Sequence, residues 1–150
     1  MGMEHFHDNI FGYSDDTYFS IVRDAVKRFP SGSHFVEVGA LLGKSSSYIV
    51  FTENMKPVEG YYNAIRKTST EAFSSYEDES LEFVMIDGDH SQSAVENDIT
   101  NWLPKIKSGG LLAGDDYGHA GVKAACEKLL ANNSHGEFSY WTTKWFFNKG

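Results

Sequence analysis

Two short apolar runs in this chain each end in a pair of carboxylates, and this repeated pattern constrains the fold more than any other feature. Residues 83–86 lead into Asp87 and Asp89, and residues 111–113 lead into Asp115 and Asp116. A short, nearly all-apolar run is typical of a parallel strand that is buried on both faces. The sequence therefore predicts two buried strands with acidic carboxyl ends.

A helix is predicted between these two runs. Apolar residues recur at helical spacing over residues 94–103, Ser91 is positioned to cap the helix, and Pro104 ends the pattern. Glu96, Asn97 and Asp98 are predicted to form its polar face. A right-handed crossover would place the two acidic strand ends side by side, where ligands bind in open α/β sheets. We therefore expect an acidic crevice.

Length and composition favour a single soluble domain over residues 1–150, with residues 1–13 as an N-terminal arm. The formal net charge of -8 argues against nucleic acid as a partner and favours a small ligand or a cation. Cys126 is the only cysteine, so no intrachain disulfide can form. It is expected to lie on the apolar face of a helix and to be buried in the core. Cytoplasmic localisation is the expectation.

A glycine-rich turn follows the predicted strand 34–38. Gly39 and Gly43 enclose three residues, whereas a Walker loop requires four, so a nucleoside triphosphatase is rejected. The turn and the helix start after it still form a general anion-binding device. Glu37 lies just before the turn and either bonds the loop amides or binds a ligand. Lys44, at the helix start, is a weaker candidate.

Helix and strand alternate along the rest of the chain. We expect helices over residues 14–29, 45–55 and 122–131, a strand over 61–66, and a C-terminal hairpin about Thr142 and Thr143. The fold class is therefore α/β, with a mostly parallel sheet of about six strands, an antiparallel end and helices on both faces.

Two segments of this chain resemble the class I S-adenosylmethionine-dependent methyltransferases. Residues 35–46, FVEVGALLGKSS, look like the first motif of that family, and residues 83–122 are similar to its metal-dependent catechol and antibiotic-sugar O-methyltransferases. The resemblance implies a Rossmann-like fold, S-adenosylmethionine as cofactor, magnesium as a metal, and methyl transfer to a hydroxyl of a small molecule or sugar.

The resemblance also implies roles for individual residues. The cofactor-binding positions are Glu37, Gly39, Gly43, Lys44, Ser45, Thr68, Ser69 and Asp87. The metal-binding positions are Asp87, Asp115 and Asp116, whose hard oxygens suit magnesium. The catalytic positions are Asp87 with His90 or Asp89 as general base. Two simpler roles stay open, since strand-end aspartates often cap the next helix and His119 is expected to cap one rather than line the site.

The chain departs from the family pattern after Gly43. Only 21 residues separate Gly39 from Tyr61, which leaves no room for the family's second strand and the acid that binds the cofactor ribose. The alternative function is therefore a degenerate methyltransferase-like module that binds no cofactor. The same deletion would expose the edge at residues 61–66, where we expect a homodimer to form.

Overall fold

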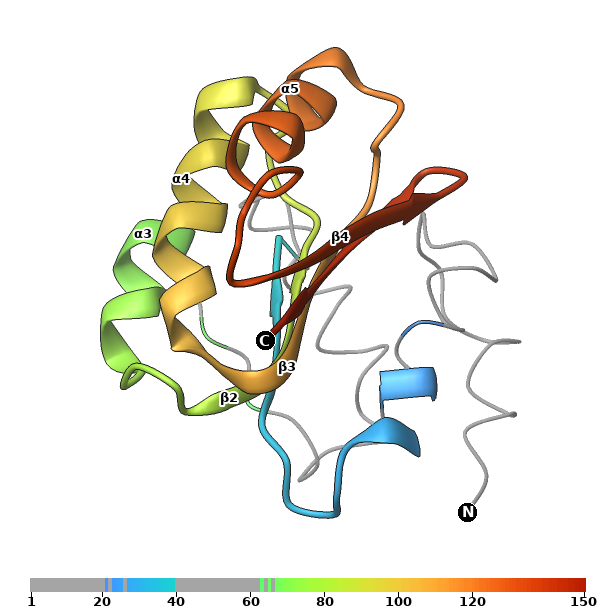
Figure 1. The fold of residues 1–150 in the computed structure, drawn as a ribbon. Coiled ribbons are helices and arrows are strands. Elements are labelled where there is room, and N and C mark those ends of the chain that lie inside the picture. The colour runs from blue at the N-terminus through green and yellow to red at the C-terminus, as the bar shows by residue number, and fades with distance from the viewer. Residues whose placement is uncertain (1–20, 22, 26, 40–62, 64, 66) are drawn as a thin grey trace, which may run out of the picture. The chain divides into compact units, whose positions relative to one another are not determined.

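The computed structural model describes residues 21, 23–25, 27–39, 63, 65 and 67–150 (Figure 1). Several sequence predictions lie outside these residues: the N-terminal arm, the helix 45–55, the cofactor-binding positions Gly43, Lys44 and Ser45, and the aromatic dimer surface. Residues 21, 23–25, 27 and 28 are helical, in agreement with the helix predicted over residues 14–29.

The chain divides into two compact units. One comprises Met1–Arg28 with Leu41–Ile65, and the other comprises Phe29–Ala40 with Arg66–Gly150. The second unit contains the whole described sheet and the acidic strand ends. Within the described part of the chain, no helix is long and apolar enough to cross a membrane.

The sheet of the second unit has five strands in the order β1-β2-β3-β5-β4. β1 (Phe35–Val38), β2 (Leu81–Ile86) and β3 (Ile106–Gly114) run parallel, and β5 (Lys144–Lys149) and β4 (Gly136–Trp141) follow as an antiparallel hairpin. The parallel sheet with an antiparallel end is therefore confirmed. A sixth strand was predicted over residues 61–66, of which the structure describes only Asn63 and Ile65, neither in a strand.

Three helices of this unit lie on one side of the sheet (Figure 1). α3 (Ser69–Ala72) continues into the short 3-10 helix η4 (Phe73–Ser75), α4 (Gln92–Trp102) continues into η5 (Leu103–Lys105), and α5 is Ala120–Leu129. The apolar spacing of the sequence thus placed α4 and α5 within about two residues of their observed ends.

The core lies between α4, α5 and the central strands. Its members are almost completely removed from water, and they include Val84, Leu112, Val95, Ile99, Trp102, Val122, Ala125, Trp145 and Phe147. Cys126 is buried among them, as predicted. Burial raises the pKa of its thiol to about 12, so Cys126 is core filling and not a thiolate nucleophile.

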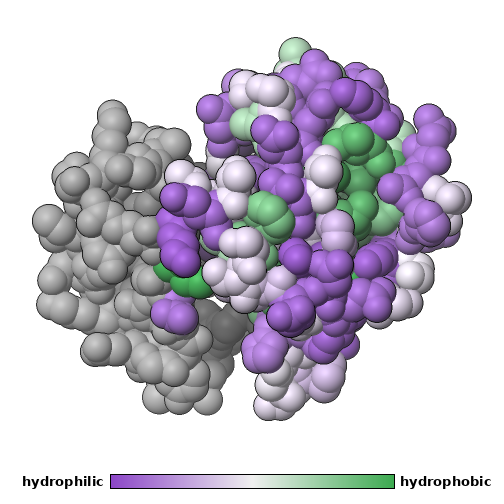
Figure 2. Space-filling model, turned by 90° about the vertical axis from the view of Figure 1, so that its left-hand side faces the viewer, coloured by the Kyte–Doolittle hydropathy of each residue, from purple (hydrophilic) through white to green (hydrophobic). Residues whose placement is uncertain are grey.

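The face shown in Figure 2 is mainly hydrophilic over the described residues, with small apolar patches between the polar side chains. Three large hydrophobic side chains are exposed among the described residues: Ile65, Tyr140 and Trp141. Tyr140 stacks on Tyr117 with 4.4 Å between ring centroids, so the exposed end of the hairpin packs on the loop that follows β3.

Candidate functional site

The carboxyl ends of β2 and β3 lie next to each other, because the two strands are parallel neighbours and Ile86 pairs with Gly114. Asp87 and Asp115 follow these two residues directly. The Asp87 amide donates to Val38 O at 2.8 Å and the Asp115 amide donates to Ile86 O at 3.3 Å. The predicted juxtaposition of the acidic ends is therefore confirmed.

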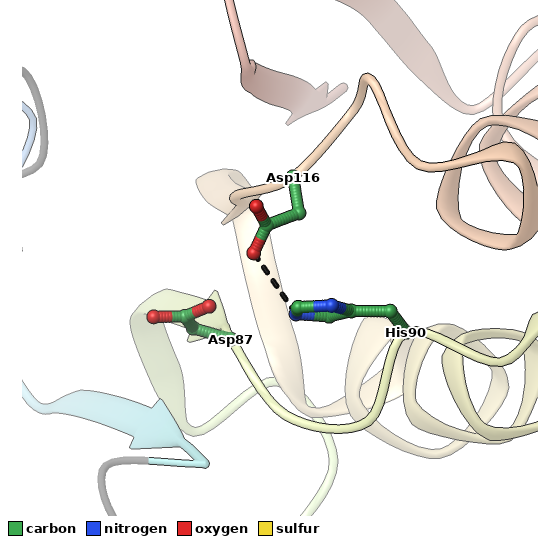
Figure 3. Close-up of side chains that lie close together, drawn as sticks. All are labelled: Asp87, His90 and Asp116. Atoms are coloured by element: carbon green, nitrogen blue, oxygen red, sulfur yellow. Dashed lines mark ion pairs between the residues drawn. The ribbon is translucent and has the colours of Figure 1, made fainter. Parts of the chain in front are cut away.

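Three side chains converge at this edge: Asp87, His90 and Asp116 (Figure 3). Each offers one ligand atom, and these atoms all lie within 4.8 Å of one another. His90 Nε2 is 2.9 Å from Asp116 Oδ2, so the imidazole and the carboxylate form a direct pair. We call these residues the acidic cluster.

The conformation of Asp116 directs its carboxylate toward His90. Asp116 has a φ of 58°, in the left-handed region that non-glycine residues rarely adopt. Its amide donates to Asp115 Oδ1 at 2.6 Å, which holds this turn in place. Such a conformation has an energetic cost and persists only where the surrounding structure enforces it.

Asp87 lies in an unfavourable environment for a negative charge. Burial, together with the negative charges of Asp115, Asp116 and Glu37, raises the pKa of Asp87 to about 6, and His90 only partly offsets these effects. A cation beside Asp87 would relieve both effects, because it offsets the desolvation and the repulsion between like charges.

Asp115 lies outside the cluster even though the sequence grouped it with Asp87 and Asp116. Its Oδ2 accepts a hydrogen bond from Lys144 Nζ at 2.7 Å, and its Oδ1 accepts from the Asp116 amide. The structure thus brings His90 to the two aspartates, while the third predicted metal ligand is bound to a lysine.

Asp89 is not part of the cluster and forms a turn just before α4. Its Oδ1 accepts a hydrogen bond from the Ser91 amide at 2.6 Å, and this bond holds the pKa of Asp89 below its usual range. One of the two aspartates after β2 was expected to cap the helix, and Ser91 was placed to do so; Ser91 is the N-cap residue of α4, but no side chain caps the helix there. Between the two candidate bases, the geometry favours His90.

His119 lies at the N-cap position of α5 but makes no side-chain capping bond. Its ring is instead 4.7 Å from the ring of His90, centroid to centroid, at an interplanar angle of 51°. Gly121, in the first turn of α5, allows the backbone of residue 90 to approach, since a Cβ there would lie 2.3 Å from His90 O. The start of α5 thus packs against the cluster.

The described part of the predicted cofactor region begins at the end of β1. Gly39 has a φ of 91°, and a Cβ at this position would lie 2.2 Å from Asp87 O. Only glycine allows the turn after β1 to approach the end of β2 so closely. Glu37 is close enough to raise the pKa of Asp87, so its charge belongs to the same end of the sheet.

Thr68 and Ser69 use their hydroxyls within the chain. Thr68 forms a capping box with Glu71 at the start of α3. Ser69 donates a short hydrogen bond to Asp98 and accepts one from Trp102 Nε1 at 2.8 Å. These contacts show how both residues support α3, and their role in cofactor binding stays a prediction.

Sequence reasoning missed two residues of these networks, Asp98 and Lys144. Asp98 was assigned to the polar face of α4 but is buried, and burial raises its pKa. Its spacing of three and four residues from Val95 and Trp102 was a signal that it lies on the apolar face. Lys144 carries no comparable short-range signal, because its partner Asp115 is distant in sequence.

The acidic cluster fits a divalent cation. Two carboxylates and an imidazole are ordinary ligands of such ions. Neighbouring ligands of an octahedral ion at about 2.1 Å are roughly 3 Å apart, and the His90 to Asp116 distance of 2.9 Å agrees with that spacing. The raised pKa of Asp87 is a further sign that the site lacks positive charge.

Comparison with known proteins identifies a methyltransferase relationship. Residues 46–117 match the model of a family described as methyltransferase domain. A segment of 70 residues is 33% identical to the uncharacterized protein y4gI of Sinorhizobium fredii. This segment is 47% of the present chain and only 8% of that protein, so the chain spans less than a tenth of the relative.

Solved structures show the same fold at low sequence identity. A putative caffeoyl-CoA O-methyltransferase from Staphylococcus aureus has a TM-score of 0.75 at 14% identity, over 93% of this chain and 86% of that one. An rRNA methylase from Streptococcus thermophilus has a TM-score of 0.68 at 14% identity, over 93% and 99%. MycE, in complex with Mg and SAH, has a TM-score of 0.58 at 14% identity, over 97% and 52%. These structures thus confirm the predicted methyltransferase-like fold.

Proposed function

We propose that this chain is an S-adenosylmethionine-dependent methyltransferase that acts on a hydroxyl of a small molecule or sugar. The observation that carries the proposal is the acidic cluster at the carboxyl edge of a methyltransferase-like sheet. Ligands of open α/β sheets bind at this edge. The methyltransferase domain model matched over residues 46–117 supports the reaction class.

A small substrate is favoured over RNA. One structural neighbour is described as an rRNA methylase, but a similarity of 14% identity shows the fold alone. Binding to a phosphate backbone depends on clustered lysine and arginine. This chain has 13 such residues against 21 acidic ones, and its acidic groups gather at the proposed site.

His90 is the proposed general base. Its Nε2 lies 2.9 Å from Asp116 Oδ2, and an imidazole can accept a proton from a hydroxyl near neutral pH. The negative charge of Asp116 would stabilise the imidazolium that forms, as the carboxylate of a catalytic triad does. The chain thereby orients the substrate oxygen and removes its proton.

Glu37 and Gly39, beside Asp87, are the described residues that would line the cofactor, which would supply an electrophilic methyl group on a positively charged sulfur. His90 would take the proton of the substrate hydroxyl as the oxygen accepts the methyl group and the sulfur keeps the electron pair of the broken bond. The contribution of the protein to this step is mainly the positioning of the reactants.

A metal-assisted form of the same reaction is favoured by the fit of the acidic cluster to a cation. Asp87, Asp116 and His90 would hold the ion, which supplies a lower pKa for a bound hydroxyl. In this form His90 is a ligand and not the base. Methyl transfer measured once with magnesium and once with a chelator separates the two forms of the reaction, because only the metal-assisted form is lost when the chelator is present.

Calorimetry with S-adenosylhomocysteine tests the proposal. We expect saturable binding by the wild type and binding about tenfold weaker by Glu37→Gln, which removes one charge next to the cofactor position. Asp78→Asn is a matched control, since Asp78 pairs with Lys105 away from the site. Absence of binding at millimolar ligand would instead support the alternative, a methyltransferase-like module that has lost its cofactor.

A further inference from the structure

A buried lysine lies behind the acidic cluster. Lys144 is the first residue of β5, and its side chain is 1% exposed. Among the described residues, only Lys144 and Asp98 are charged and buried. Burying an ammonium group is costly unless it is paired and hydrogen-bonded, so the position of Lys144 requires a strong partner.

Asp115 is that partner, and both of its carboxylate oxygens accept hydrogen bonds. Lys144 Nζ donates to Asp115 Oδ2 at 2.7 Å and to Thr143 Oγ1 at 3.2 Å. The other carboxylate oxygen of Asp115 accepts from the Asp116 amide at 2.6 Å. Each oxygen of Asp115 thus has a donor from the chain itself.

The same hairpin holds the backbone of the site. The Tyr117 amide donates to Thr143 O at 2.7 Å, and Trp145 Nε1 donates to Asp115 O at 3.2 Å. Trp145 reaches this place because Gly114 has no side chain, as a Cβ there would lie 2.2 Å from the indole. Three consecutive residues of the hairpin therefore contact the loop that follows β3.

We propose that Lys144 is a positioning residue that acts as a permanent counter-ion and withdraws Asp115 from the ligand set of the site. A divalent cation would then bind through Asp87, His90 and Asp116 alone. The physical reason is competition, since recruiting Asp115 as a ligand would leave a buried ammonium without its carboxylate. This inference rests on the metal-assisted form of the proposed function.

The arrangement also explains how Asp116 reaches the cluster. Lys144 fixes the carboxylate of Asp115, which in turn fixes the Asp116 amide and so maintains the left-handed turn at Asp116. Lys144 is thus connected to His90 through the carboxylates of Asp115 and Asp116, and only the carboxylate of Asp116 faces the cluster.

Manganese binding to the cofactor-free protein, measured by electron paramagnetic resonance, tests the inference. Four proteins are compared: the wild type, Asp116→Asn, Lys144→Met/Asp115→Asn, and Lys149→Met as a control. The double variant replaces the ion pair by neutral groups of similar volume, a change that proteins often tolerate. Lys149 is also on β5 but bonds Ile106 O, so its loss reports the effect of removing any lysine of that strand.

We expect Asp116→Asn to weaken manganese binding about tenfold or more, because it removes a ligand oxygen. The double variant and Lys149→Met should stay within about threefold of the wild type, because Asp115→Asn keeps the Oδ1 that accepts the Asp116 amide and both variants leave the three ligands unchanged. A loss in the double variant as large as that in Asp116→Asn would show that Asp115 is a ligand and overturn the inference.

Lys144→Met alone supplies a second, independent readout. If the lysine competes with the cation, its removal frees the Asp115 carboxylate and manganese should bind about tenfold more tightly than to the wild type. Binding that is unchanged or weaker in this folded variant would contradict the proposal. A wild type that binds no manganese would remove the cation site, whereas S-adenosylhomocysteine binding would still decide the methyltransferase proposal separately.

Discussion

The ends of β2 and β3 have similar sequences, but their carboxylates are used in opposite order. After β2, the first acid, Asp87, belongs to the cluster, and the second, Asp89, bonds the Ser91 amide before the next helix. After β3, the first acid, Asp115, is bound to Lys144, and the second, Asp116, belongs to the cluster. Each end therefore supplies one carboxylate to the acidic cluster and one that is bonded within the chain.

The difference arises from where each carboxylate that is bonded within the chain finds its donor. Asp89 is satisfied by the amide of Ser91, two residues away, as in an Asx turn. Asp115 is satisfied by Lys144, 29 residues away, on a strand that joins the sheet later in the chain. The end of β2 is thus built locally, whereas the end of β3 depends on the C-terminal hairpin.

The contact between β1 and the end of β2 gives the largest expected effect. Gly39→Ala would place a Cβ 2.2 Å from Asp87 O at a φ of 91°. We expect it to lower the free energy of unfolding by about 3 kcal/mol, because overpacking and backbone strain add. Urea denaturation followed by circular dichroism measures this change.

Gly32→Ala is the matched control for Gly39→Ala. Gly32 has nearly the same φ, 89°, but a Cβ there meets nothing within 4 Å. Gly32→Ala should lower the free energy of unfolding only by the cost of the left-handed conformation, about 1 kcal/mol. Equal losses in the two variants would mean that the close approach of β1 to Asp87 does not support the end of β2.

The Asp87 carboxylate at the end of β2 should limit the stability of the metal-free protein. The pKa of Asp87 is raised from 3.8 to about 6, so the folded state binds the proton more tightly than the unfolded state does. Stability contributed by this group therefore falls as pH rises from about 4 to about 6. Asp87→Asn removes that loss and should stabilise the protein at pH 7.5.

The expected gain from Asp87→Asn at pH 7.5 is about 1 kcal/mol, since solvent screening reduces the larger value implied by the shift alone. The gain should shrink as pH falls and vanish only well below pH 3.8, where the carboxyl is protonated in both states. Urea titrations of both proteins at pH 7.5 and at about pH 4, with a chelator present, measure it. A gain that is the same at both pH values would point to a packing effect instead of relief from charge repulsion.

The sheet was predictable because its signals are short-range. Each of its patterns is formed by residues that are close in sequence. These patterns are the apolar runs of β2 and β3, the helical spacing of α4 and the turn between β4 and β5. Hydrophobic periodicity reports such local features well. The juxtaposition of Asp87 and Asp115 followed from strand order, because carboxyl ends of parallel neighbours share one edge.

The division of roles within the site was not predictable, because it depends on distant contacts. The sequence grouped Asp115 with Asp87 and Asp116, since nothing near residue 115 shows that Lys144 binds it. The left-handed φ of Asp116 is also set by tertiary contacts, as non-glycine residues do not favour it. By contrast, the position of Ser91 at the start of α4 was predicted, because the signal for a helix start is local.

The smallest effect of a substitution is expected at the turn that Asp89 forms with Ser91 before α4. Asp89→Ala removes the acceptor of the Ser91 amide, which lies at the start of α4 and next to His90. The exposed carboxylate contributes little to global stability, because water replaces the lost partner at little cost. We therefore expect faster hydrogen exchange at the Ser91 amide, as a helix end opens by local fraying rather than by global unfolding. Asp89→Asn keeps an acceptor oxygen and should preserve slow exchange.

Exchange at the Asp116 amide is the control for coupling between the two strand ends. Because Asp115 and Lys144 hold the end of β3 independently of the Asp89 turn, this exchange should be the same in both variants and the wild type. Faster exchange there in Asp89→Ala would show that the two strand ends are coupled and that the Asp89 turn supports the whole cluster.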